Sequence, residues 1–121
     1  MLGIRGATTA DANTREAILD ATEELLRAIV EANALEEEAV GAVFFTATAD
    51  LNAAFPAAAA RIRLGWERTA LLDAEEIDVP GAAQSVIRVL LLVNTDKSKD
   101  DLSHVYLKGA ANLRARSVND R

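Results

Sequence analysis

The sequence contains no cysteine and only one histidine, His104. Without cysteine the chain cannot form a disulfide framework, a thiolate nucleophile or a zinc site built on thiolates. A single histidine also argues against a structural metal centre, which usually draws on several nitrogen or sulfur ligands. We therefore expect no metal site in this protein.

Long apolar runs and a surplus of positive charge are missing as well. No apolar stretch approaches the roughly 20 residues of a membrane span, and the start of the chain lacks the basic and then apolar run of a signal peptide. The formal net charge is −6, whereas binders of nucleic acids or anionic membranes carry a basic surplus. The sequence therefore predicts a cytoplasmic protein with neither nucleic acid nor membrane as partner.

The length of the chain and its few aromatic residues indicate what kind of core it has. The chain has 121 residues, which is enough for one domain with a real core. Aromatic residues make up 4% of the sequence, so alanine, leucine and valine must fill that core. No repeat or linker interrupts the chain, so we expect a single domain over residues 1–121, with residues 115–121 as a polar, flexible tail.

One long amphipathic helix is the clearest element of the sequence. Thr14 is a candidate N-cap, and a helix of about five turns follows it. Its apolar residues recur at helical spacing and predict one buried face, formed by Ile18, Ala21, Leu25, Ile29 and Ala32.

The remaining segments alternate between short strands and turns. Pro56 suits the first turn of a second, short helix over 56–64, and Gly65 suits its end. Apolar and β-branched runs predict strands over 2–8, 40–48, 66–72, 85–95 and from 104 into the tail. Polar or Pro-Gly segments predict loops over 73–82 and 96–103.

This order of elements predicts an α+β fold, a mixed β-sheet with one long and one short helix. The long helix covers one face of the sheet and leaves the other face or an edge to be covered. The strand over 86–93 is very apolar, so we expect the chain to self-associate.

Two arginines in apolar segments are the first candidates for chemistry. Arg88 is the single charge within "VIRVLLLV", where burial is costly unless the charge is paired or placed at a ligand. It either serves a site, pairs with Glu75 or Glu76, or faces solvent from a strand edge. Arg5 lies in the glycine-flanked segment "GIRG", which suits a guanidinium that binds a planar anion.

Other polar side chains have both a structural and a functional interpretation. Arg61 and Arg63 are two apart on a helix, so at most one of them can face a site. The acids Glu75 and Glu76 either face water or include one acceptor for a substrate hydroxyl. Tyr106 is either a core residue with a satisfied hydroxyl or a hydrogen-bond donor at the site.

Two further residues are assigned structural roles. Trp66 follows the glycine that ends the short helix, and we expect it to pack in the core. His104 follows a turn, and we expect it at the surface rather than in acid/base catalysis. Since no catalytic triad order, phosphate loop or metal-ligand spacing is present, the inventory suits a small dianion and a reaction that needs charge stabilisation without a nucleophile.

Six segments spanning residues 4–114 resemble, in order and spacing, the signature segments of a known family. They are "IRGATT", "DLNAAFPAAAAR" with the following "GW", "EIDV", "IRV", "HVYL" and "LR". The family is that of the monofunctional bacterial chorismate mutases of the trimeric pseudo-α/β-barrel type. The resemblance implies a homotrimer that builds the barrel, with active sites at the subunit interfaces. It also implies an isomerase that converts chorismate to prephenate by a concerted Claisen rearrangement without a cofactor.

The resemblance further implies a role for each matching residue. Arg88 would contact the ether oxygen and the nearby carboxylate, and Glu76 would accept a hydrogen bond from the ring hydroxyl. The implied substrate-binding residues are Arg5 and Tyr106 on carboxylates, Phe55 in the apolar wall, Arg61 closing over the site, Asp73 in the lining and Leu113 near the mouth.

Two positions depart from the family pattern, and two other functions stay open. Ala58 stands where the family can carry a lysine near the mouth of the site, and Asp73 stands where it can carry a cysteine beside the ring. The first alternative is an enamine/imine deaminase, which has a similar trimeric architecture and an interfacial arginine. The second is a non-catalytic binder of an aromatic-pathway metabolite.

Overall fold

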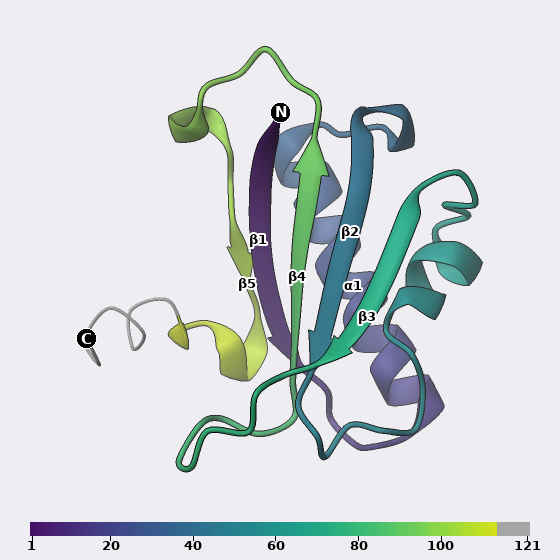
Figure 1. Cartoon of the computed structure of the whole chain (residues 1–121), viewed down its shortest axis with the longest axis vertical. Coiled ribbons are helices and arrows are strands. Elements are labelled where there is room, and N and C mark those ends of the chain that lie inside the picture. Colours follow the sequence, from purple (N-terminus) through teal and green to yellow (C-terminus); the bar gives the residue numbers. More distant parts are fainter. Residues whose placement is uncertain (114–121) are drawn as a thin grey trace.

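A single mixed sheet forms the centre of the structure, and one long helix lies behind it (Figure 1). The computed structural model describes residues 1–113, so the predicted tail over 115–121 lies outside the described residues. The main elements in chain order are β1 (Leu2–Thr9), α1 (Arg15–Asn33), β2 (Val40–Ala47), β3 (Ala70–Glu75), β4 (Val86–Val93) and β5 (Val105–Tyr106).

The strands follow the order β3-β2-β4-β1-β5 across the sheet. The central strand β4 runs antiparallel to both β1 and β2, while β5 pairs with β1 and β3 pairs with β2 in parallel. This arrangement confirms the predicted mixed sheet. The first two strands and β4 also lie within two residues of their predicted bounds.

Helix α1 begins as its sequence predicts, with Thr14 as N-cap. The Thr14 hydroxyl accepts a hydrogen bond from the Ala17 N–H at 3.1 Å. The predicted buried face is confirmed except for Ala32, which is exposed. Its place is taken by the buried Asn33, four residues after Ile29, because the buried stripe follows the helical period to the end of the helix. The Asn33 amide then bonds the Ser103 carbonyl at 2.9 Å and fixes the loop before β5.

Gly6 allows α1 to lie close against β1. A Cβ added there would lie 2.7 Å from the Ile29 side chain and 3.0 Å from the Val105 carbonyl oxygen. A larger residue would therefore push α1 and β5 away from the strand that carries Arg5. Gly6 is therefore needed for the close packing of α1 and β5. The sequence alone could not distinguish this packing role from a role of the glycine-flanked segment in ligand binding.

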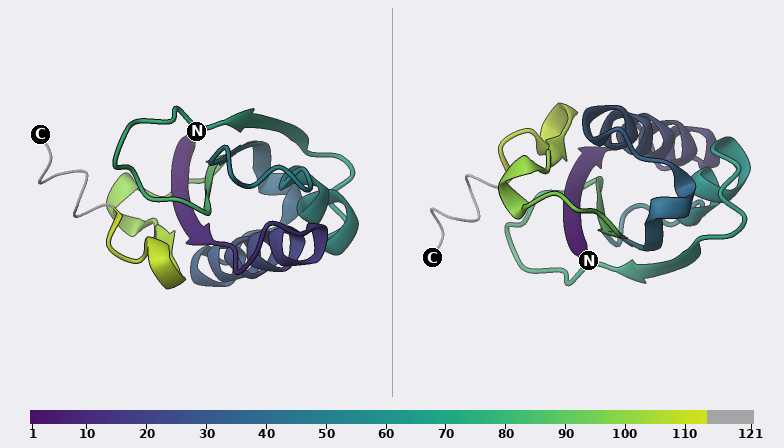
Figure 2. Two further views of the ribbon diagram at one scale, coloured as in Figure 1. Left: turned by 90° about the horizontal axis from the view of Figure 1, so that it is seen from below. Right: turned by 90° about the horizontal axis from the view of Figure 1, so that it is seen from above.

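The two faces of the sheet differ in what covers them. The face toward α1 carries fully buried side chains, among them Ile4, Val43, Phe45 and Leu91. Alternate residues point to the opposite face, here called the open face. On it Phe44, Leu72 and Leu90 remain 39%, 58% and 38% exposed. Figure 2 shows α1 on one side of the sheet and the loop after β3 on the other.

The short helix is present in the predicted place but has a different geometry. A brief helical turn at residues 57–58 leads into a π-helix, Ala59–Arg63, in which the Leu64 N–H bonds the Ala59 carbonyl at 3.1 Å. Gly65 then adopts a positive φ of 72° and ends the segment as predicted. Trp66 is buried in the core, which confirms its predicted packing role.

The strand predicted over 66–72 is wrong in its bounds, since β3 covers Ala70–Glu75 and takes in part of the predicted loop. The residues before it are held by other contacts. Trp66 N–H bonds the Ala60 carbonyl, and the Glu37 carboxylate accepts from Thr69 and Arg68. Pairing with β2 can therefore begin only at Ala70.

The last strand is shorter than predicted, because only Val105 and Tyr106 pair with β1. The chain then turns into a short 3-10 helix, Lys108–Ala110, and Lys108 adopts a φ of 49°. The Gly109 N–H donates to the Thr9 hydroxyl at 3.2 Å, which anchors this turn to the end of β1.

Candidate active site

One row of residues across the open face gathers the predicted catalytic and binding side chains. In the strand registers Arg88 lies directly opposite Thr46 on one side and Ala7 on the other, and Ala7 lies opposite Tyr106. Residues directly opposite one another share a face. Arg88, Thr46 and Tyr106 therefore project from the same side of the sheet.

Glu76 completes this row from the end of β3. Its carboxylate oxygen Oε1 lies 2.7 Å from Arg88 Nε and accepts a hydrogen bond from the Thr46 hydroxyl at 3.0 Å. Its backbone N–H bonds the Ala47 carbonyl at 2.9 Å, which fixes where the side chain leaves the sheet. The structure thus brings together the two residues predicted as catalytic. It also confirms pairing with Glu76 among the alternatives for Arg88.

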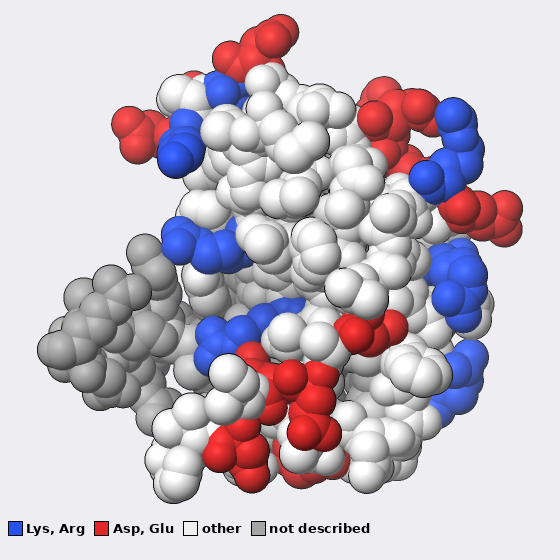
Figure 3. Space-filling view, in the orientation of Figure 1, with Lys and Arg blue, Asp and Glu red and all other residues white. Residues whose placement is uncertain are grey.

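The Arg88–Glu76 pair is open to solvent, with side-chain exposures of 40% and 20%. Figure 3 views the open face and shows adjoining blue and red side chains low on this face, below a central area of mainly uncharged side chains. An exposed ion pair contributes little to stability. Because the pair is only partly buried, a ligand on the open face can reach it.

Arg5 lies in the neighbouring row, opposite Leu90. Its Nε is buried and has no hydrogen-bond partner among the described residues, although buried donors are normally satisfied. Its backbone N–H donates to Nδ1 of His104 at 2.9 Å. His104 is exposed as predicted, and this backbone contact is a structural role that the sequence did not indicate.

Tyr106 and Leu113 belong to a small cluster at the β5 edge of the sheet. Leu113 is buried with Ala7, Val86 and Ala110, and the half-buried Tyr106 packs against this cluster. The cluster places both residues next to the row that carries Arg88.

A second group of predicted residues lies around a cavity of about 490 Å³ at the ends of β2 and β3. Phe55 and Asp73 line it, together with Arg15, and Phe55 is 73% exposed. Asp73 is opposite Phe45 in the sheet and so lies toward the α1 side, away from the face of Arg88. The residues that line this cavity include neither Arg88 nor Glu76.

Asp73 has a structural partner that explains an aspartate at this position. Its carboxylate accepts the Ala57 N–H at 3.0 Å at the start of the short helix. Burial raises the pKa of Asp73, while the Ala57 hydrogen bond and the nearby charge of Arg61 act in the opposite direction. Ala58 is buried against Leu19 of α1, so its small side chain serves the packing of the short helix.

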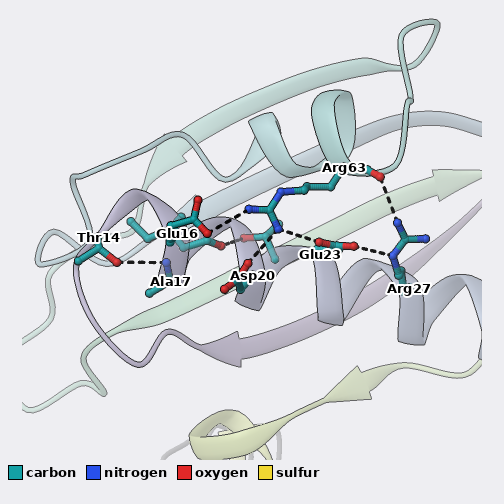
Figure 4. Close-up of polar contacts among 9 residues, drawn as sticks. Thr14, Glu16, Ala17, Asp20, Glu23, Arg27 and Arg63 are labelled. Carbon is teal, nitrogen blue, oxygen red and sulfur yellow. Dashed lines mark hydrogen bonds and ion pairs between the residues drawn. The ribbon is translucent and has the colours of Figure 1, made fainter.

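The two arginines of the short helix have different surroundings, as their spacing predicts. Arg63 lies 2.9 Å from Asp20, 2.8 Å from Glu23 and 3.7 Å from Glu16, all on α1 (Figure 4). These carboxylates raise the pKa of Arg63 and hold the short helix against α1. Arg61 is exposed and is left as the arginine of this pair that can face a ligand.

A polar network at the end of β2 was not indicated by the sequence. Asp50 accepts hydrogen bonds from the Thr48 hydroxyl at 2.5 Å, the Ser85 N–H at 2.9 Å and the Ser85 hydroxyl at 3.0 Å. Ser85 has a φ of 58°, and its two contacts with Asp50 hold this left-handed residue just before β4. Short polar residues such as those in "TATAD" are common in turns, so their spacing alone carried no signal.

We expect Asp50→Asn to lower the free energy of unfolding at pH 7 by about 1.5–3 kcal/mol, the range for hydrogen bonds to a charged group. The hydrogen bond from Thr48, followed by those from Ser85, lowers the pKa of Asp50. A lowered pKa stabilises the fold above the unfolded value of about 3.9, and this stabilisation is lost as pH falls through the folded value.

The measurement is urea unfolding of both proteins between pH 7 and pH 3. The difference between them should shrink as the solution becomes acidic. Asp73 contributes with the opposite sign because its pKa is raised, but it is present in both proteins and cancels. A difference that is independent of pH would show that the charge of Asp50 does not matter.

Within residues 1–113 no group of three or more metal-ligating side chains is found, and no helix is long and apolar enough to cross a membrane.

Comparisons with known proteins agree on one family. The sequence model described as "Chorismate mutase type I" matches residues 1–117. The chain is 52% identical over 113 residues to "Chorismate mutase AroH" of Thermus thermophilus, covering 93% of this chain and 92% of that protein. It is 43% identical over 112 residues to "Chorismate mutase AroH" of Bacillus subtilis (strain 168), covering 93% and 88%.

A solved structure agrees with the sequence comparisons. A chorismate mutase from Clostridium thermocellum superimposes with a TM-score of 0.89 at 52% identity, covering 91% of this chain and 97% of that one. None of these matches is a deaminase, so they favour a chorismate mutase over the enamine/imine deaminase considered from the sequence. With its Arg88–Glu76 pair on a matching fold, the chain belongs to the chorismate mutase type I family.

Proposed function

We propose that this protein converts chorismate to prephenate, with Arg88 and Glu76 as its catalytic residues. The observation that carries this proposal is the Arg88–Glu76 contact of 2.7 Å on the open face of the sheet. The family membership of the chain supplies the reaction.

The reaction is an intramolecular rearrangement. The ether C–O bond of chorismate breaks while a new C–C bond forms in the same step, so no atom is gained or lost. It needs no nucleophile, general base or metal, but the substrate must be held in its folded, diaxial conformer. Negative charge develops on the ether oxygen as the C–O bond breaks, and a preorganised cation can stabilise it.

Arg88 is suited to this task because only part of its guanidinium is used inside the chain. Nε is paired with Glu76, which leaves the two Nη groups for the ether oxygen and the nearby carboxylate. Glu76 accepts a hydrogen bond from the ring hydroxyl and so orients the ring. A rate gain near 10⁶ requires about 8 kcal/mol, which conformer selection and one well-placed guanidinium can supply.

Arg5 and Tyr106 bind the carboxylates of the substrate. The buried, unpartnered Nε of Arg5 supports this role, since a bound carboxylate would satisfy it. The position of Tyr106 in the row of Arg88 and Ala7 supports the second contact.

The active protein is a homotrimer whose sites lie between neighbouring subunits and whose sheets build a pseudo-α/β-barrel. Two observations support this. Phe44, Leu72 and Leu90 remain partly exposed on the open face and need cover. Phe55 and Asp73 line the cavity away from the face of Arg88, and Arg61 lies near Asp73, so the three can reach the same substrate from a neighbouring subunit. Leu113 lies near the mouth of the site.

The experiment that tests the activity is incubation of the purified protein with chorismate after exhaustive chelation and dialysis. We expect first-order loss of chorismate absorbance and stoichiometric prephenate by NMR, with no added metal or nucleotide. Binding without turnover would identify a non-catalytic binder. Restoration of an inactive dialysed sample by a metal would overturn the mechanism. The cytoplasmic location stays a prediction from the sequence.

A further inference from the structure

The two oxygens of the Glu76 carboxylate differ in their contacts. Oε1 receives both the Arg88 Nε at 2.7 Å and the Thr46 hydroxyl at 3.0 Å. The closest approach of the two side chains is between Arg88 Nε and Glu76 Oε1, and within residues 1–113 Oε2 receives no hydrogen bond. Arg88 and Glu76 therefore form no bidentate hydrogen-bonded pair in the part of the chain that the structure describes.

A single-point contact is not the usual arrangement of arginine and carboxylate. These groups frequently pair through two parallel N–H···O bonds, which are strong and geometrically specific. Both side chains are partly exposed, so solvent does not prevent such a rearrangement. A bidentate pair would occupy Oε2 and one Nη group, which are the atoms that the proposed reaction needs.

Thr46 lies where its hydroxyl can prevent a bidentate Arg88–Glu76 pair. It lies directly opposite Arg88 in the pairing of β2 with β4, and opposite Ala74 in the pairing of β2 with β3. The sheet register therefore fixes its backbone beside Arg88 and the end of β3. A β-branched side chain has few rotamers, so its hydroxyl is held toward Oε1.

We propose that Thr46 is a positioning residue that keeps the Glu76–Arg88 pair in this one-point contact and so leaves Oε2 and both Nη groups to the substrate. This inference rests on the proposed function. Thr46 acts through Glu76 and has no contact with the reacting atoms.

The test compares Thr46→Val, which removes the hydroxyl at nearly constant shape, with Thr46→Ser, which retains it. We expect Thr46→Val to lower kcat/KM about 10-fold to 100-fold, as for a lost hydrogen bond to a charged group, with a fall in kcat as well as any rise in KM. Thr46→Ser should recover most of the activity. Thr46→Ala serves as a second variant if the valine protein does not fold.

A matched control and a double variant separate this role from a structural one. Thr22 also donates a hydroxyl hydrogen bond, to the Ile18 carbonyl at 2.7 Å, but within α1. Thr22→Val should change the unfolding midpoint and leave kcat unchanged. In a Glu76→Gln background Thr46→Val should have little further effect, because both changes act on the same contact.

The outcomes are distinct. A folded Thr46→Val or Thr46→Ala protein with wild-type kcat and KM would overturn the inference. So would a decrease in kcat/KM on Thr46→Val that is as large in the Glu76→Gln background as in the wild type. An absence of prephenate with the wild-type protein would instead refute the proposed function itself.

Discussion

Replacement of Arg88 by citrulline is expected to lower kcat by at least about 10²–10³, or roughly 2.7–4 kcal/mol, by analogy with the loss of an oxyanion-hole donor. Citrulline keeps the planar shape of arginine and an N–H at the position that contacts Glu76 Oε1 at 2.7 Å. It removes the positive charge. In the proposed mechanism that charge stabilises an oxygen that becomes anionic only in the transition state, so substrate binding should weaken far less than kcat falls.

Two further variants make this result specific. Arg88→Lys should rescue only part of the activity, since a point charge lacks the planar fork that serves ether oxygen and carboxylate together. Truncation of Arg5 should act largely through KM, because the proposed carboxylate contact would be present in both ground and transition states. A citrulline variant with near-normal kcat and a raised KM would show that Arg88 is a binding residue and would refute this mechanism.

The regular elements of the fold could be predicted because burial of one face makes apolar residues recur at the period of the helix or strand. Helix α1 and strand β4 owe their predicted bounds to apolar spacing and to the Thr14 cap. The segment before β3 was mispredicted because long-range contacts, such as that of Glu37 with Thr69, determine where pairing starts. Such contacts leave no local pattern in the sequence.

The candidate site was predicted in part from residue chemistry and in part from resemblance. A lone charge in the most apolar strand indicated Arg88. Its partner could not be chosen between Glu75 and Glu76, because the direction of each side chain depends on where β3 ends and on the Ala47 contact of Glu76. The individual roles came from the matching segments alone. Thr46 and Asp50 were missed because threonine and aspartate have many structural uses.

The separation of the site residues into two groups leads to the second large effect. Arg88 and Glu76 lie on the open face, whereas Phe55 and Arg61 lie on the short-helix side of the sheet edge. If neighbouring subunits each supply one group, a Phe55→Ala/Arg61→Ala variant and an Arg88→Ala variant are both inactive alone. Phe55 and Arg61 are exposed, so their replacement leaves the core intact.

The decisive measurement is the activity of trimers assembled from equal amounts of these two variants, by co-expression or by mixed refolding. In a ring of three heterologous interfaces, about a quarter of the sites then combine two intact halves, so we expect about a quarter of the wild-type kcat per site. A mixture of Arg88→Ala with Glu76→Ala, which damages the same half twice, should stay inactive. If mixed trimers form and show no more activity than the two variants measured separately, the site is not shared between subunits and the account is wrong.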